Sequence, residues 1–128
     1  MSTNGTPFEG RDNIIATRVY TGLEMRLYTN TSNSLTDASV LADLTYPSGT
    51  GYAHQSIADS WSSSNGVVTH PTNVQFENTG GTNWTGDVTG AALTDGTYIL
   101  HFKDLTLGTV TMTPGDILEI DLSSFISV

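Results

Sequence analysis

Three histidines are the residues of this chain best suited to metal or acid–base chemistry, because cysteine is absent. His54, His70 and His101 fall in three different predicted strands, and no two of them have the H-x-H or H-x-x-x-H spacing typical of a metal site. We therefore interpret all three as structural or surface residues, and we expect neither a bound metal nor a cofactor.

The thirteen carboxylates include two groups that are close in sequence. Asp87 and Asp95 flank one predicted strand, and Asp116, Glu119 and Asp121 lie near the C-terminus. Paired carboxylates can hydrolyse glycosides, but that reaction also needs a deep cleft with aromatic sugar platforms, for which 128 residues leave little room. Asp95 and Asp116 stand beside glycine in predicted turns, where aspartate commonly accepts hydrogen bonds from its own backbone.

Motifs for other enzyme chemistries are missing from the sequence. It contains no D-x-[DN]-x-[DN]-G calcium loop and no G-x-S-x-G nucleophile elbow. The glycine pairs 49–51 and 80–81 lack the lysine and helix that follow in phosphate-binding loops. We therefore predict that the chain is not an enzyme and has no catalytic residues.

The aromatic residues are the remaining candidates for a functional surface. Exposed tryptophan and tyrosine can stack on sugars or anchor protein interfaces. We interpret Trp61, at the end of a predicted strand, as a core residue, whereas burial and interface use both remain open for Trp84 in its Gly/Asn/Thr loop. The candidate interface residues, including three from the N-terminal segment, are Pro7, Phe8, Arg11, Tyr52 and Trp84.

The charge of the chain restricts its partners. Four basic residues against thirteen acidic ones give a formal net charge of −9. So few basic residues cannot neutralise a phosphate backbone or an anionic membrane surface, so we expect no nucleic acid and no membrane as partner. A partner with local positive charge is favoured instead. No stretch approaches the roughly 20 apolar residues of a membrane span, and residues 1–10 lack the apolar core of a signal peptide.

The chain divides into two regions with different residue patterns, and the candidate residues are distributed over both. Residues 1–11 are polar and predict a flexible N-terminal arm, followed by a single β-rich domain over 12–128. Asp12 as N-cap and Gly22 as C-terminal stop predict one short helix between them. A strand is the alternative for this segment, because isoleucine, threonine and valine favour β structure.

From Leu23 onward, short apolar runs alternate with turn residues. The predicted strands cover 23–28, 52–61, 67–70, 73–77, 88–93, 98–102, 105–112 and 117–122, and 40–46 is either a strand or a turn of helix. Turns are predicted over 30–37, 47–51, 62–66, 95–96 and 114–116, and the strands 98–102 and 105–112 are expected to pair. About eight short strands at this spacing predict a mostly β fold, an antiparallel β-sandwich or jelly roll.

Several segments of the chain, in their order, resemble a known family. They are Gly22-Leu23-Glu24-Met25-Arg26-Leu27-Tyr28-Thr29-Asn30, then Gly51-Tyr52-Ala53 and Trp61, then Val67–His70 before Val74-Gln75-Phe76, and Pro114-Gly115-Asp116 before the last strand. Over residues 12–122 the chain resembles the capsid decoration (cement) proteins of tailed bacteriophages. In these, a short helix ends at glycine and runs into a strand.

The resemblance implies a non-enzymatic virion structural protein. Such proteins are β-rich, often form homotrimers, and attach to the outer surface of the major capsid protein lattice, where they lock neighbouring capsomers. The resemblance therefore implies synthesis in the host cytoplasm and a final location on the outer capsid. It carries over no set of binding residues. The arm, residues 1–11, would order on a neighbour, for example by adding a strand to an open sheet edge.

Two other functions remain open at this point. A phage tail or head-tail component belongs to the same class of structural proteins. A carbohydrate-binding β-sandwich module belongs to another class, with Trp61, Trp84 and Tyr52 as stacking platforms for sugar rings.

Overall fold

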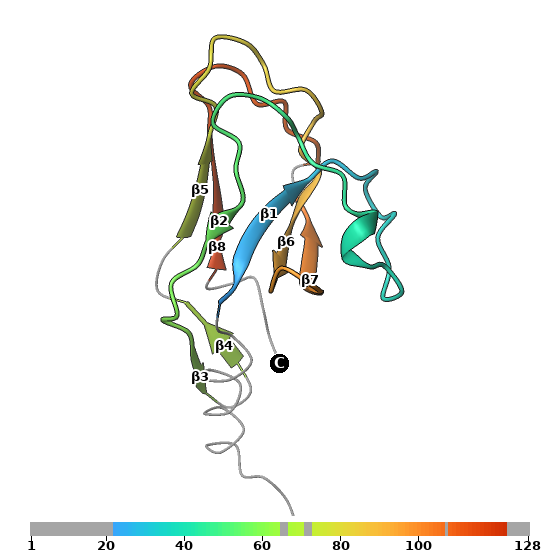
Figure 1. Cartoon of the computed structure of the whole chain (residues 1–128), viewed down its shortest axis with the longest axis vertical. Helices are drawn as coiled ribbons and strands as arrows, with labels where there is room; N and C mark the ends of the chain where they lie inside the picture. The colour runs from blue at the N-terminus through green and yellow to red at the C-terminus, as the bar shows by residue number, and fades with distance from the viewer. Residues whose placement is uncertain (1–21, 65–66, 71–72, 107, 123–128) are drawn as a thin grey trace, which may run out of the picture.

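The computed structural model describes residues 22–64, 67–70, 73–106 and 108–122, and this span is β-rich (Figure 1). Its strands are β1 (Glu24–Tyr28), β2 (Gln55–Ser56), β3 (Ser62–Ser64), β4 (Val67–Thr69), β5 (Asn73–Glu77), β6 (Gly90–Thr94), β7 (Ile99–Asp104) and β8 (Ile117–Asp121). The 3-10 helix η2 (Leu41–Asp43) lies between β1 and β2. The predicted mostly β, antiparallel chain is confirmed. The predicted arm over 1–11 and helix near 12–20 lie outside the described residues.

All strand pairs of the described residues are antiparallel, and they form three sheets. The largest is a four-stranded sheet with the order β2-β1-β6-β7, and two-stranded ladders join β3 to β4 and β5 to β8. In the large sheet Met25 pairs with Leu93, while Val74 pairs with Ile120 in the β5–β8 ladder. The β5–β8 ladder lies beside the large sheet and is tilted against it (Figure 1).

The main core lies between the large sheet and the β5–β8 ladder. Alternation places Met25 and Leu27 of β1 on the inward face, where they join Leu93 of β6, Phe76 of β5 and Ile120 of β8 in one buried cluster. Each fully buried large apolar side chain contributes about 1.5–3 kcal/mol of transfer free energy, so this cluster is the main stabilising element of the chain.

The opposite face of the large sheet is also covered, which the sequence pattern did not predict. Tyr28 and Ala92 are fully buried there. They are covered by Leu35, from the segment between β1 and η2, and by Leu44, the residue after η2. The tyrosine ring lies directly over β6: a Cβ atom added to Gly90 would be 2.2 Å from the Tyr28 hydroxyl.

The predicted strand over 52–61 is wrong for most of its length. Only Gln55 and Ser56 pair with β1. Further along β1, the hydroxyl of Tyr52 takes the place of a strand neighbour, because it accepts a hydrogen bond from Leu27 N and lies equally close to Leu27 O, both at 3.2 Å. A side chain thus satisfies the backbone groups that a longer β2 would have used.

Two further predictions are also corrected. Ser62–Ser64 was expected within a turn but forms β3, because its ladder with β4 uses backbone groups and requires no apolar side chains. The predicted strand 105–112, expected to pair with 98–102, forms only the single bridge of Val110 to Val88, since Gly108 adopts φ 87° and closes a turn with Leu105. Strand β7 pairs with β6 instead.

Candidate functional site

Trp84 is a core residue of the chain. It is 3% exposed, and its indole N–H donates a 2.9 Å hydrogen bond to the carbonyl of Thr50. The absence of a side chain at Gly49 makes room for the ring, since a Cβ there would lie 2.3 Å from Trp84 Cδ1. Of the two interpretations open from the sequence, burial is confirmed, and Trp84 offers almost no surface to a partner.

The other aromatic candidates also pack inward. The half-buried ring of Tyr52 stacks on Phe76 at 6.1 Å and meets Trp84 edge to face at 5.4 Å between centroids. Trp61 is 7% exposed and lies edge-on to His70 at 4.8 Å, which confirms its predicted core role. Burial raises the pKa of the Tyr52 hydroxyl. The remaining interface candidates, Pro7, Phe8 and Arg11, lie outside the described residues.

The carboxylates singled out in turns hold the backbone, as predicted. Asp95 Oδ1 accepts hydrogen bonds from the amides of Thr97 and Tyr98 at 2.8 and 2.7 Å. Asp116 Oδ2 accepts from the amide and hydroxyl of Thr113 at 2.9 and 2.7 Å. These hydrogen bonds favour the charged form and lower the pKa of both carboxyl groups. Their chemistry is therefore that of structural acceptors.

Asp104, which the sequence did not single out, likewise accepts hydrogen bonds. These hold the segment that follows β1 against the large sheet. Its Oδ1 accepts from the Tyr28 hydroxyl and its Oδ2 from the amide of Asn33, both at 2.7 Å. This one carboxylate therefore joins β7 to β1 and to the following loop. Burial, followed by the hydrogen bond and charge of Asp104, raises the pKa of the Tyr28 hydroxyl.

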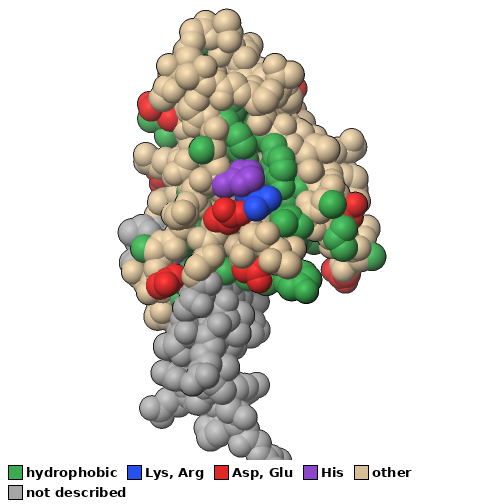
Figure 2. All heavy atoms as spheres, viewed as in Figure 1, with side chains coloured by type: hydrophobic (Ala, Val, Ile, Leu, Met, Phe, Trp, Pro, Cys, Tyr) green, Lys and Arg blue, Asp and Glu red, His purple; other side chains and the backbone are tan. Residues whose placement is uncertain are grey.

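A compact polar cluster lies on the covered face of the large sheet, near its edge. Arg26 Nε and Nη2 both donate to Glu24 Oε1, and Nη1 donates to the Tyr46 hydroxyl at 2.8 Å. The His54 ring lies 5.0 Å from the Tyr46 ring, with Nδ1 3.9 Å from Glu24 Oε1. Figure 2 shows basic, acidic and histidine side chains together in the middle of this face, with hydrophobic side chains beside them.

The ionisation of this cluster leaves it without net charge near neutral pH. Burial alone would raise the pKa of Glu24, but hydrogen bonds from Arg26 and Thr94 outweigh it and the pKa is lowered. Burial, and then the positive charge of Arg26, lower the pKa of His54, so its ring is neutral at pH 7. One carboxylate and one guanidinium therefore balance each other beside a neutral imidazole.

A wide hollow of about 570 Å³ opens next to this cluster, and we call it the Arg26 hollow. It is lined mainly by apolar groups around the guanidinium: Arg26, Val40, Leu41, Leu44, Tyr46 and Thr97. Sequence alternation predicted that Glu24 and Arg26 share one face of a strand, but no sequence signal brings η2 and the turn before β7 to the same place.

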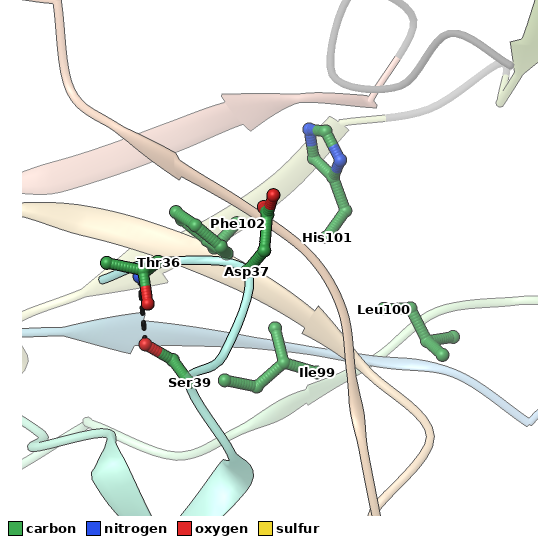
Figure 3. Close-up of a pocket in the computed structure, with 7 residues that line it drawn as sticks. All are labelled: Thr36, Asp37, Ser39, Ile99, Leu100, His101 and Phe102. Atoms are coloured by element: carbon green, nitrogen blue, oxygen red, sulfur yellow. Dashed lines mark hydrogen bonds between the residues drawn. The ribbon is translucent and has the colours of Figure 1, made fainter.

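A second hollow of about 360 Å³ runs between β7 and the loop before η2 (Figure 3). Thr36, Asp37 and Ser39 line it from the loop, and Ile99–Phe102 line it from β7. The loop is held in shape by the Thr36 amide, which donates to the Ser39 hydroxyl at 2.9 Å (Figure 3). A third, smaller hollow of about 180 Å³ separates β7 from β8.

Comparison with known proteins adds no family to these observations. No protein-family model matches the chain, and neither curated proteins nor solved structures show significant similarity to it.

Within the described span, no three histidine or carboxylate groups come close enough together to hold a metal ion. No described helix is long and apolar enough to cross a membrane. The described residues thus combine an apolar hollow beside a neutralised ion pair with a framework whose turn carboxylates hold the backbone.

Proposed function

We propose that this chain is a non-enzymatic virion structural protein of the capsid decoration (cement) type. In this role it binds the outer surface of a tailed-phage major capsid lattice and stabilises it. The protein would be synthesised in the host cytoplasm, assemble as a homotrimer and have its final location on the outer capsid.

The observation that carries this proposal is the distribution of charge. Residues 1–21 hold two basic and two acidic residues, so the net charge of −9 belongs entirely to residues 22–128, with Arg26 and Lys103 as their only basic residues. Arg26 is already neutralised by Glu24. A rigid β framework with such an excess of negative charge suits attachment to a shell with basic patches, and electrostatic steering speeds such encounters.

The fold that we propose is a small β-sandwich with the large sheet as one layer and the β5–β8 ladder as the other. The shared core of Met25, Phe76 and Ile120 supports this arrangement. A sandwich held by buried side chains and turn hydrogen bonds suits a protein that must stabilise a lattice without moving parts.

The test combines the oligomeric state with direct binding. Light scattering of the pure protein measures its mass, and co-sedimentation with capsid shells from its native source measures attachment. We expect a stable trimer that sediments with shells at a fixed stoichiometry. A monomer that stays in the supernatant at every shell concentration contradicts the proposal.

The two alternatives are separated by other measurements. Copy number in purified particles distinguishes a shell protein, present in hundreds of copies, from a tail or head-tail component. The carbohydrate-binding alternative has lost its main support, because Trp61 and Trp84 are buried and cannot stack on a sugar ring. If the protein binds no sugar on a glycan array, the carbohydrate-binding alternative is excluded.

A further inference from the structure

One exposed apolar residue lines the Arg26 hollow, and another is next in sequence to a lining residue. Val40, which lines it, is 58% exposed, and Tyr98, which follows the lining residue Thr97, is 67% exposed. Few large hydrophobic side chains of the described span are so exposed, and the others lie at Leu100 and Ile117. Exposed apolar groups gathered at a concave, mainly apolar surface are typical of protein interaction sites.

Both residues stand on turns that are held rigidly in place. Asp43 Oδ2 accepts from the amide of Val40 at 2.8 Å, and Asn30 Nδ2 donates to the Asp43 carbonyl at 2.7 Å. Tyr98 is held in the same way by Asp95, through the 2.7 Å hydrogen bond described above. Because the backbone at both residues is held by hydrogen bonds, a partner that contacts them has less backbone entropy to remove on binding.

The polar base of the hollow can also be covered without leaving a charge unpaired. Covering a charged pair costs desolvation, and the further cost is smaller when the pair is already largely buried and hydrogen-bonded. Arg26 already donates to Glu24 and Tyr46, and the side chains of the Arg26–Glu24 pair are 14% and 26% exposed. A partner can therefore cover this pair at little further cost in solvation.

Acidic groups stand next to the hollow and decide the charge of its partner. Asp43 follows the lining residue Ala42, and Asp95 precedes the lining residue Thr97 by two positions. Both carboxylates are exposed and point their charge toward solvent around an apolar centre. The complementary surface has an apolar projection with lysine or arginine residues around it.

We propose that the Arg26 hollow, with Val40 and Tyr98 beside it, is the surface that contacts the major capsid protein, through an apolar projection of that protein surrounded by basic residues. This inference rests on the proposed function and adds to it the face of the molecule and the chemistry of the contact.

The experiment measures binding of the full-length chain to capsid shells by co-sedimentation. We expect Tyr98→Ala to weaken binding at least tenfold and Val40→Ala to weaken it several-fold. Asp43→Asn retains an acceptor oxygen for the Val40 amide but removes one negative charge. We expect it to weaken binding at low salt and to have a smaller effect at high salt, where charges are screened.

Ile117→Ala is the matched control, because Ile117 is a similarly exposed apolar residue, at 56%, on the β5–β8 ladder. We expect this variant to bind shells like wild type, and thermal melts to show all four variants folded. If wild type binds while Tyr98→Ala and Val40→Ala bind equally well, the face is wrong and the proposed function stands. If Tyr98→Ala instead changes the oligomeric state alone, the hollow is a contact between copies and this inference is wrong. If wild type does not bind shells, both proposals fail.

Discussion

The two faces of the large sheet are both covered, but by different means. The inner face packs Met25 and Leu27 against the β5–β8 ladder and the two tryptophans, with almost purely apolar contacts. The outer face lies under the segment that contains η2, and hydrogen bonds such as those of Asp104 to Tyr28 and Asn33 hold it there. The inner side keeps the small hollow of about 180 Å³ between β7 and β8, whereas the outer cover leaves the wider Arg26 hollow open beside it.

This difference separates stability from recognition within one sheet. Apolar burial contributes free energy in proportion to area and leaves nothing accessible to a partner. A cover held by directional hydrogen bonds can be shaped, because each bond fixes the position of a backbone segment. Changes on the inner face should therefore reduce stability, and changes on the outer face should reduce stability less.

Removal of the Trp84 side chain should have the largest effect. Trp84→Ala deletes a buried indole and leaves the Thr50 carbonyl without its donor, so we expect a loss of about 3–5 kcal/mol in the free energy of unfolding. Urea denaturation followed by circular dichroism measures this. Trp84→Phe keeps most of the apolar contact and should lose less. An unchanged midpoint in Trp84→Ala would show that the indole contributes no packing energy to the inner face.

Tyr28→Phe should have an intermediate effect on the outer face. It removes the 2.7 Å hydrogen bond to Asp104, and we expect a loss of about 0.5–1.5 kcal/mol because a partly buried acceptor is left with fewer donors. The raised pKa of the Tyr28 hydroxyl also means that the folded state holds its proton above pH 10, the ordinary value, where the unfolded chain releases it. Stability therefore declines as the pH rises above 10, and part of this decline should be absent in Tyr28→Phe.

The control for this change is Tyr98→Phe, which removes a hydroxyl from an exposed ring. We expect its stability to match wild type within about 0.5 kcal/mol. Equal losses in the two variants would mean that the Asp104 hydrogen bond does not hold the outer layer.

Asp116→Asn should have the smallest effect and should depend on pH. The pKa of Asp116 is lowered from its ordinary value of 3.8, so its contribution is present above that value and is lost as the pH falls through the folded-state pKa. Wild type should exceed the variant in stability at pH 6 and lose this advantage by pH 2, as measured by thermal melts across that range. A difference that stays constant with pH would assign the effect to the side-chain shape and not to its charge.

Alternation of apolar residues identified the parts of the fold that depend on local pattern. It correctly predicted β1 and β8, because one face of each meets the main core, but it also predicted a strand over 52–61, of which only Gln55 and Ser56 pair with β1. The glycine neighbours of Asp95 and Asp116 correctly predicted turns at these positions, since aspartate beside glycine accepts hydrogen bonds from nearby amides. These features depend on residues only a few positions apart.

The remaining features depend on contacts between distant segments. The short β2 follows from a tyrosine hydroxyl, at Tyr52, that bonds the backbone of Leu27 25 positions earlier in the chain. The outer cover depends on Asp104 and Asn33, which are separated by 71 positions. The Arg26 hollow combines β1, η2 and the turn before β7. The periodicity of apolar residues and the composition carry no information about such long-range contacts. The Arg26 hollow could therefore not be predicted, although its Glu24–Arg26 pair lies on one strand.

The edge-to-face contact of Tyr52 with Trp84, at 5.4 Å, gives the chain a built-in optical reporter. At such a separation, light absorbed by the tyrosine is transferred efficiently to the indole, whose surroundings are dry because the ring is buried. Unfolding separates the two rings and exposes the indole to water, which shifts its emission to longer wavelength. The intrinsic fluorescence of the unlabelled protein therefore reports whether its core has remained intact.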